Sequence, residues 1–136
     1  MPCGVVLARK HNVSRIARSV DYIGSLDTTI SGSRNGFTPL VLWHRIKMLG
    51  LDGLRRRAGD ALAVAAYAVQ RLREAGVPAW RNENALTVVF PRVPDELRDR
   101  WQLATQDSIS HFIAMPGITK DLVDAFVEDL RCSASR

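Results

Sequence analysis

The pattern of apolar positions changes character within the first forty residues. Residues 4–8 are an uninterrupted apolar run, which is typical of a strand buried on both faces. Between residues 13 and 23 apolar side chains recur at helical spacing, and Gly24 follows them. Residues 25–37 show no helical periodicity. This part of the chain therefore predicts a strand, a helix and a long loop.

Two helices are predicted next. Thr38 is a suitable N-cap, with Pro39 at the first helical position, and this helix is expected to end near Gly50. A longer helix should follow and end at Gly76. Its apolar stripe consists of Leu51, Leu54, Ala58, Leu62, Ala65, Val69 and Leu72.

Short strands and helices alternate beyond residue 76. The expected elements are strands at 78–81, 86–90 and 109–115, a helix at 95–104, and a last helix capped by Thr119. The complete order predicts an α/β chain in two parts. Residues 1–53 are expected to be the end of a large parallel-sheet domain with its connecting helix, because a lone buried strand needs neighbours. Residues 54–136 are expected to form a small α+β domain.

Composition narrows the class of protein. The 136 residues are 46% hydrophobic and 24% charged, as in an ordinary globular protein, and no apolar stretch approaches the roughly 20 residues of a membrane helix. Cys3 and Cys132 form no metal-type spacing, which favours a reduced, cytoplasmic protein. The net charge of +5 raises the possibility of nucleic-acid binding. The arginines at 55–57, 71 and 73 are interleaved with acidic residues, however, so we expect no nucleic-acid partner. Because no apolar stretch has the length of a membrane helix, we also expect no membrane partner.

Few residues have the types and spacing needed for catalysis. His11, His44 and His111 are far apart, and none has metal-ligand spacing. No Gly-x-Ser-x-Gly or His-Glu-x-x-His motif occurs. We therefore expect no metal site, and no catalytic residue is assigned.

The segment SGSRNG at 31–36 is the best candidate for binding. Its two glycines can take up positive φ and let successive N–H groups converge on an anion. Its serines add hydroxyl donors, and Arg34 adds a planar fork suited to phosphate or carboxylate. The alternative is an ordinary turn rich in Ser, Asn and Gly that carries a surface arginine.

Four blocks carry a family resemblance that covers the chain from Met1 to about Leu130. They read MPCGVVLARK, DYIGSLDTTISGSRNGFTPLVLWHRI, AWRNENALTVVFPRV and RWQLATQDSISHFIAMP. Together they resemble the group II pyridoxal-phosphate-dependent amino-acid decarboxylases, in the branch of bacterial histidine decarboxylases and plant serine decarboxylases. The resemblance implies part of a fold type I lyase that uses pyridoxal 5'-phosphate on an amino-acid substrate, as a homodimer or higher oligomer formed through the large domain.

The resemblance also implies which functions this chain carries. The Schiff-base lysine of such enzymes follows Ser-x-His, a segment that would precede Met1, so we expect a C-terminal fragment that is inactive alone. Cofactor-binding residues would be Gly32, Ser33, Arg34 and Asn35, with Ser33 donating to the cofactor phosphate across the subunit interface. A non-catalytic, truncated dimerisation module is the alternative of another class.

Two departures from the family pattern bear on the substrate. Phe37 stands where many relatives carry histidine, and Ala85 stands where many histidine decarboxylases carry serine. Both positions are expected near the substrate. Decarboxylation of histidine to histamine is favoured slightly, and decarboxylation of L-serine to ethanolamine is the alternative.

Overall fold

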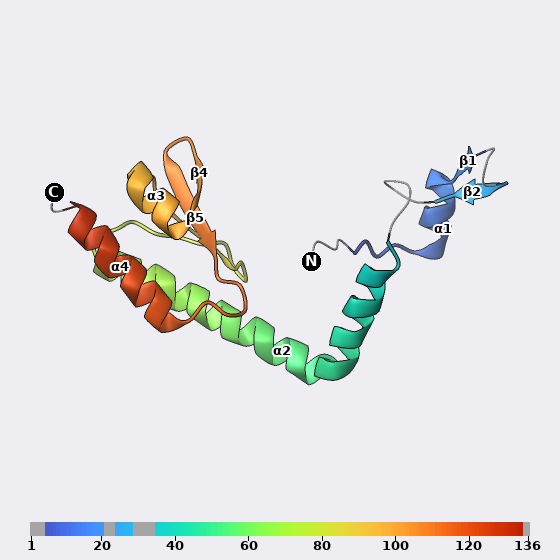
Figure 1. Cartoon of the computed structure of the whole chain (residues 1–136), viewed down its shortest axis with the longest axis horizontal. Coiled ribbons are helices and arrows are strands. Elements are labelled where there is room, and N and C mark those ends of the chain that lie inside the picture. Colours follow the sequence, from blue (N-terminus) through green and yellow to red (C-terminus); the bar gives the residue numbers. More distant parts are fainter. Residues whose placement is uncertain (1–4, 21–23, 29–34, 135–136) are drawn as a thin grey trace. The chain divides into compact units, whose positions relative to one another are not determined.

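The computed structural model describes residues 5–20, 24–28 and 35–134, and the chain divides into two compact units, Met1–Gly50 and Leu51–Arg136 (Figure 1). The division falls within α2 (Phe37–Glu74). Gly50 there has φ of 61° and ψ of −176°, angles that are essentially restricted to glycine. The helix is therefore broken at the glycine where the sequence predicts an end.

Before α2, the described residues of the first unit form only short elements. They are the helix α1 (Lys10–Val13), the 3₁₀ turn η1 (Ser14–Ile16) and the strands β1 (Arg18–Val20) and β2 (Ser25–Asp27). The two strands form an antiparallel hairpin in which Ser19 lies opposite Leu26. Thr38 is the one buried residue among those of this unit whose exposure the structure describes.

The strand predicted at 4–8 is wrong over its described residues. Residues 5–9 have no regular secondary structure, and Val5, Val6 and Leu7 are 60%, 71% and 92% exposed. A strand exists only with a partner for its backbone groups. The described residues of this unit place no such partner beside the segment.

The helix predicted at 13–23 is also wrong, although residues 21–23 lie outside the described part. Helical structure ends at Ile16, and residues 18–20 pair as a strand. Gly24 has φ of 62° between the paired strands instead of ending a helix. Most helical stability in proteins comes from burying an apolar face, and Ile16 is 52% exposed.

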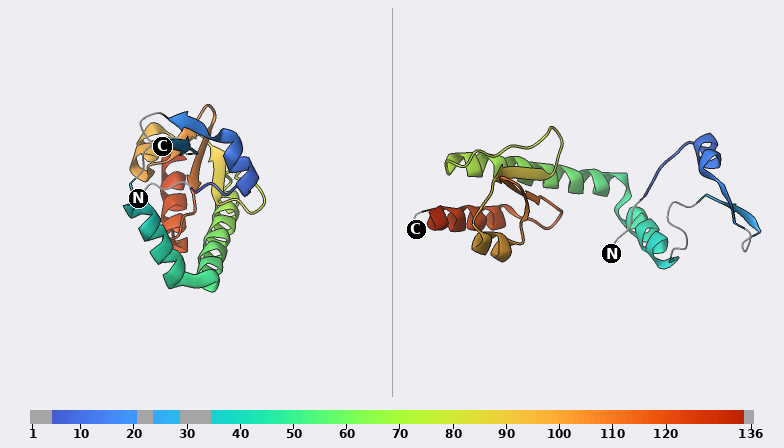
Figure 2. Two further views of the ribbon diagram at one scale, coloured as in Figure 1. Left: turned by 90° about the vertical axis from the view of Figure 1, so that its right-hand side faces the viewer. Right: turned by 90° about the horizontal axis from the view of Figure 1, so that it is seen from above.

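The second unit packs three helical segments with a three-stranded antiparallel sheet. The strand order is β3 (Thr87–Pro91), β5 (Ile109–Ile113) and β4 (Ala104–Gln106). The helix α4 (Lys120–Ala134) lies beside the second half of α2, as the views in Figures 1 and 2 both show. The short helix α3 (Asp95–Trp101) contacts α4. The predicted mixture of helix and sheet is confirmed.

A single hydrophobic core holds this unit together. Helices α2, α3 and α4, the sheet and the loops between them all contribute side chains. Its buried members are Ala65, Ala68, Val69, Leu72, Ala79, Val88, Phe90, Val93, Leu97, Leu103, Ala114, Val123, Phe126 and Val127. The one buried hydroxyl of β5, Ser110 Oγ, accepts a hydrogen bond from the Val93 N–H at 3.3 Å.

In the second unit, α2 ends and α4 begins where the sequence predicts. Gly76 has φ of 80°, and the Val77 N–H donates to the Leu72 carbonyl, so this glycine ends α2 as predicted. Thr119 Oγ1 accepts from the Leu122 N–H at 3.2 Å, which confirms the predicted cap of α4. Of the strand predicted at 78–81, only an isolated bridge from Trp80 to Val89 forms.

Candidate functional site

The start of α2 directly follows the predicted anion-binding segment. Asn35 Oδ1 accepts hydrogen bonds from the Thr38 N–H at 2.8 Å and from Thr38 Oγ1 at 2.7 Å. A side-chain oxygen that accepts from the amide three residues later is the geometry of an N-cap. The prediction that Thr38 caps the helix is therefore wrong, because the helix already begins at Phe37 and Asn35 supplies the cap. Pro39 lies in the first turn, where the missing N–H costs little.

The structure describes only the end of segment 31–36. Gly32, Ser33 and Arg34 lie outside the described residues, so their predicted contacts with a phosphate stay predictions. Gly36 is exposed and does not have a positive φ, so that conformation is wrongly predicted for it. The side-chain oxygen of Asn35 is committed to the cap, which leaves its backbone N–H for the predicted ligand contact.

The two positions predicted near the substrate belong to different units. Phe37 begins α2 in the first unit and is 64% exposed. Ala85 lies in the second unit, half-buried, before β3. Its N–H donates to the Asn82 carbonyl at 3.1 Å, and its own carbonyl accepts from Arg81 Nη1 at 3.0 Å. Their roles toward a substrate stay predictions.

The histidines show no catalytic arrangement. His11 and His44 are exposed, and His111 is half-buried on β5 opposite Val89. Within the described ranges, no group of three or more His, Cys, Asp or Glu side chains could hold a metal ion. No helix there has the length and apolar character needed to cross a bilayer.

Groups with shifted pKa values gather between α2 and α4. The hydrogen bond from Arg71 Nε, helped by that from Tyr67, lowers the pKa of Asp124, and the same carboxylate raises the pKa of Tyr67. Arg71 also pairs with Glu74, whose pKa is lowered chiefly by a hydrogen bond from Gln70. Shifted pKa values can mark active sites, but these arise from an ion-pair network that joins two helices. We assign the network to packing.

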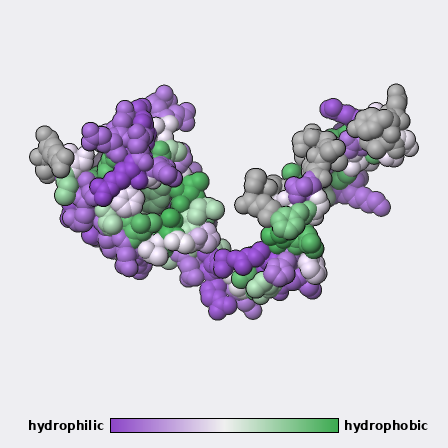
Figure 3. All heavy atoms as spheres, in the orientation of Figure 1, coloured by the Kyte–Doolittle hydropathy of each residue, from purple (hydrophilic) through white to green (hydrophobic). Residues whose placement is uncertain are grey.

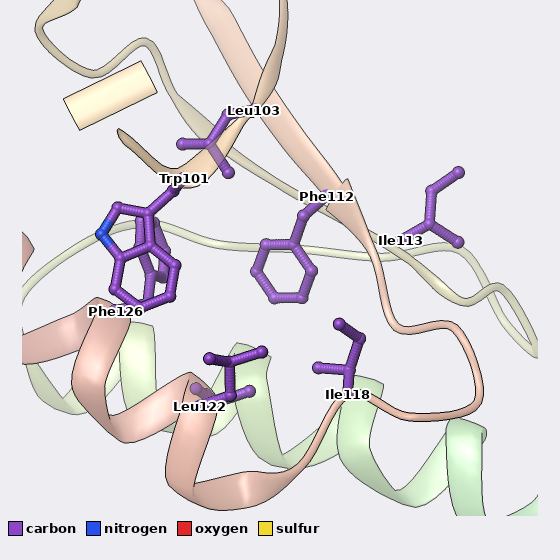
Figure 4. A pocket seen from close by; sticks show the side chains of 8 residues that line it. Trp101, Leu103, Phe112, Ile113, Ile118, Leu122 and Phe126 are labelled. Carbon is purple, nitrogen blue, oxygen red and sulfur yellow. The ribbon is translucent and has the colours of Figure 1, made fainter. Parts of the chain in front are cut away.

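A shallow apolar groove lies among α3, β5 and α4 and is not predicted by the sequence. It encloses about 100 Å³ and is lined by Trp101, Leu103, Phe112, Ile113, Ile118, Leu122, Val123 and Phe126. Figure 4 shows side chains from β5, α4 and the loop before α4 facing this space. Among these lining residues, Trp101 alone has a polar side-chain atom, and its Nε1 donates to Asp129 Oδ2 at 2.9 Å. None of these lining residues is charged.

Comparison with known proteins identifies relatives for almost the whole chain. No family model matches it. The chain is 52% identical over 130 residues to the histidine decarboxylase of Mesorhizobium japonicum. The aligned region covers 96% of this chain and 35% of that enzyme. It is 42% identical over 131 residues to serine decarboxylase 1 of Oryza sativa subsp. japonica, at 96% and 27% coverage. A solved structure of L-methionine decarboxylase from Streptomyces sp. 590 matches with a TM-score of 0.74 and 32% identity, over 87% of this chain and 26% of that one.

These findings confirm the family resemblance. The chain belongs, as a homologue of their C-terminal part, to the group II amino-acid decarboxylases, in the branch that holds histidine and serine decarboxylases. Enzymes of this family depend on pyridoxal phosphate and act on amino acids. The chain spans about a third of the length of the curated relatives that it matches.

Proposed function

We propose that this chain supplies the C-terminal segment of a pyridoxal-phosphate-dependent L-amino-acid decarboxylase that converts histidine to histamine. The observation that carries the proposal is the 52% identity, over 96% of the chain, to a histidine decarboxylase. L-serine decarboxylation to ethanolamine is the second candidate. The 42% identity to a rice serine decarboxylase supports it, as does Ala85 in place of the serine of many histidine enzymes.

The role of the chain at the cofactor follows from its donors. Ser33 donates its hydroxyl to the cofactor phosphate, Arg34 offers a cation beside it, and the backbone of Gly32 and Asn35 supports both. The segment leads into the N-terminus of α2, an end of the helix dipole that favours an anion. The phosphate belongs to the neighbouring protomer of a homodimer formed through the large domain. When bound, pyridoxal phosphate supplies the electron sink for loss of CO₂.

A chimeric enzyme tests this proposal. The matching segment of the Mesorhizobium japonicum histidine decarboxylase is replaced by this chain, and release of CO₂ is measured with L-histidine and L-serine. We expect activity on L-histidine and at least a tenfold weaker cofactor affinity after Ser33→Ala. Ser19→Ala, an exposed serine on β1, is the matched control and should leave that affinity unchanged. A folded, dimeric chimera without activity would instead favour the non-catalytic dimerisation module.

The isolated chain gives an independent test. Its lysines are Lys10, Lys47 and Lys120, and none follows a histidine in the Ser-x-His-Lys pattern. After treatment with pyridoxal phosphate and borohydride, mass spectrometry should therefore find no lysine that is labelled in preference to the others. Turnover of an amino acid by this polypeptide alone would contradict the proposed division of roles.

A further inference from the structure

The chain has four asparagines, and only Asn35 is followed by a glycine. The other three are followed by residues with a Cβ: Asn12 by Val13, Asn82 by Glu83, and Asn84 by Ala85. All four asparagines are exposed. They therefore differ in the residue that follows them rather than in their access to water.

The residue after an asparagine controls how easily the side-chain amide reacts with the main chain. The reaction begins when the backbone nitrogen of that next residue attacks Cγ of the amide, and a Cβ beside this nitrogen obstructs the approach. Gly36 is exposed and has no Cβ, and a Cβ built there would meet no described atom within 4 Å beyond its chain neighbours. Neither a side chain of its own nor the described residues around it crowd this position.

The cap of α2 holds the amide of Asn35 in one orientation. Its Oδ1 accepts from the Thr38 N–H at 2.8 Å and from Thr38 Oγ1 at 2.7 Å. A nucleophile approaches an amide carbon from outside the plane of the amide, and the two hydrogen bonds fix that plane in the capping position. The amide has to turn before the Gly36 nitrogen can attack, so the cap should slow the reaction.

The start of α2 offers no side chain that could act as the base. Residues 37–43 read FTPLVLW and contain no ionisable group. Figure 3 shows hydrophobic residues gathered on this part of α2. Asn35 and Gly36 are both exposed, so hydroxide from solvent can take the proton of the Gly36 N–H.

We propose that Asn35–Gly36 is a site of spontaneous deamidation, and that the hydrogen bonds from Thr38 restrain the reaction. The Gly36 nitrogen forms a bond to Cγ of Asn35, the bond from Cγ to Nδ2 breaks, and Nδ2 leaves as ammonia. The succinimide ring that results is then opened by one water molecule. Opening at Cγ gives aspartate, and opening at the main-chain carbonyl gives isoaspartate. No oxidant or reductant takes part.

The two products differ in their effect on α2. Aspartate keeps an oxygen acceptor for the donors of Thr38, and its negative charge suits the N-terminus of a helix. Isoaspartate adds a carbon to the main chain and displaces the capping group, so the first turn should fray. Either product adds a carboxylate to segment 31–36, and its charge repels the phosphate that this segment is proposed to bind. This last consequence alone rests on the proposed function.

Peptide mapping by mass spectrometry tests the proposal. The full chain is incubated in mildly alkaline buffer, and each asparagine is followed for the mass gain that accompanies replacement of its amide by a carboxylate. We expect Asn35 to convert at least tenfold faster than the other three asparagines, which serve as controls within the same chain. Gly36→Ala adds only a Cβ at a residue without positive φ, and it should slow Asn35 at least tenfold.

A second variant tests the role of the cap. Thr38→Val removes one of the two hydrogen bonds to Asn35 and should speed its conversion by about 2- to 10-fold. Thr87→Val, at a threonine of β3 in the second unit, is the matched control and should leave the rate at Asn35 unchanged. Conversion of wild-type Asn35 no faster than that of Asn12 would overturn the site. Equal or slower conversion in Thr38→Val would overturn the restraint.

The effect on the cofactor is measured separately. In the chimeric enzyme, Asn35→Asp reproduces one product and should weaken the affinity for pyridoxal phosphate roughly fivefold or more. An unchanged affinity would overturn the effect on the phosphate. Because peptide mapping uses the chain without cofactor or substrate, its outcome is independent of whether the proposed function holds.

Discussion

The hydroxyl of Tyr67 donates to the carboxylate of Asp124, 2.8 Å from each of its oxygens, and thereby joins α2 to α4. Arg71, one turn further along α2, donates from Nε to the same carboxylate at 2.7 Å. One side chain of α4 thus receives two donors of α2, which fixes how the two helices slide along each other. The Lys120 ammonium lies 5.0 Å from the centroid of the Tyr67 ring and adds a cation–π contact at the same place.

Removing the acceptor should weaken this helix contact. We expect Asp124→Ala to lower the free energy of unfolding of the second unit, because Tyr67 loses its acceptor and Arg71 keeps only its pair with Glu74 on the same helix. Tyr67→Phe should cost less, since the pair between Arg71 and Asp124 remains. Urea denaturation measures both effects. Glu128→Ala, which removes a pair with Arg131 on the same helix, is the control and should stay near the wild type. Equal effects of Asp124→Ala and Glu128→Ala would contradict the assignment.

The same carboxylate makes stability depend on pH. The hydrogen bonds from Arg71 and Tyr67 lower the pKa of Asp124 in the folded chain, so folding is favoured while this group is ionised. That contribution is complete above the unfolded pKa of about 4 and is lost as the pH falls through the lower folded value. We expect Asp124→Asn to reduce the loss of stability between about pH 5 and pH 2. Urea midpoints across this range measure it, and an unchanged slope would show that other carboxylates dominate.

Truncation of a side chain should lower stability in the core of the second unit, but not at the exposed Trp43 of α2. Phe90 is 1% exposed and packs with Phe126 at a ring-centroid distance of 5.5 Å. We expect Phe90→Ala to destabilise the second unit by about 3–5 kcal/mol. Trp43→Ala removes an exposed side chain and should change stability by no more than about 0.5 kcal/mol in the isolated chain. A large loss with Trp43→Ala would mean that the chain itself covers this tryptophan.

Sequence reasoning predicts best where the controlling chemistry is local. Gly50, Gly76 and Thr119 each act through their own backbone angles or an oxygen three residues away, and all three end or begin helices as predicted. The strand β4 is missed because its turn, Asp107 and Ser108, contains no glycine. Asp107 supplies the positive φ of 51° instead.

Contacts between residues far apart in the sequence limit how much of the structure the sequence predicts. The apolar run at 4–8 predicts a buried strand, but Val5, Val6 and Leu7 are exposed, and such a strand would need neighbours that the described part of the first unit does not place there. Tyr67 and Asp124 are 57 residues apart, and no local pattern pairs them. At the candidate site, the resemblance implies that Asn35 supports a phosphate through its backbone. Its side-chain amide acts as a helix cap, which was not predicted, because its oxygen is in reach of two donors of Thr38.

Loss of this cap should loosen the start of α2. Asn35→Ala removes the acceptor of the Thr38 N–H and hydroxyl, and losing an N-cap typically costs about 0.5–2 kcal/mol. Where local opening controls exchange, the amides of the first turn should then exchange with solvent roughly 2- to 30-fold faster. Hydrogen exchange read by nuclear magnetic resonance measures this in the full chain. Asn35→Asp retains the acceptor and should preserve protection, whereas Asn12→Ala on α1 should leave α2 unaffected. Unchanged exchange at Thr38 after Asn35→Ala would mean that the helix start is held by contacts other than this cap.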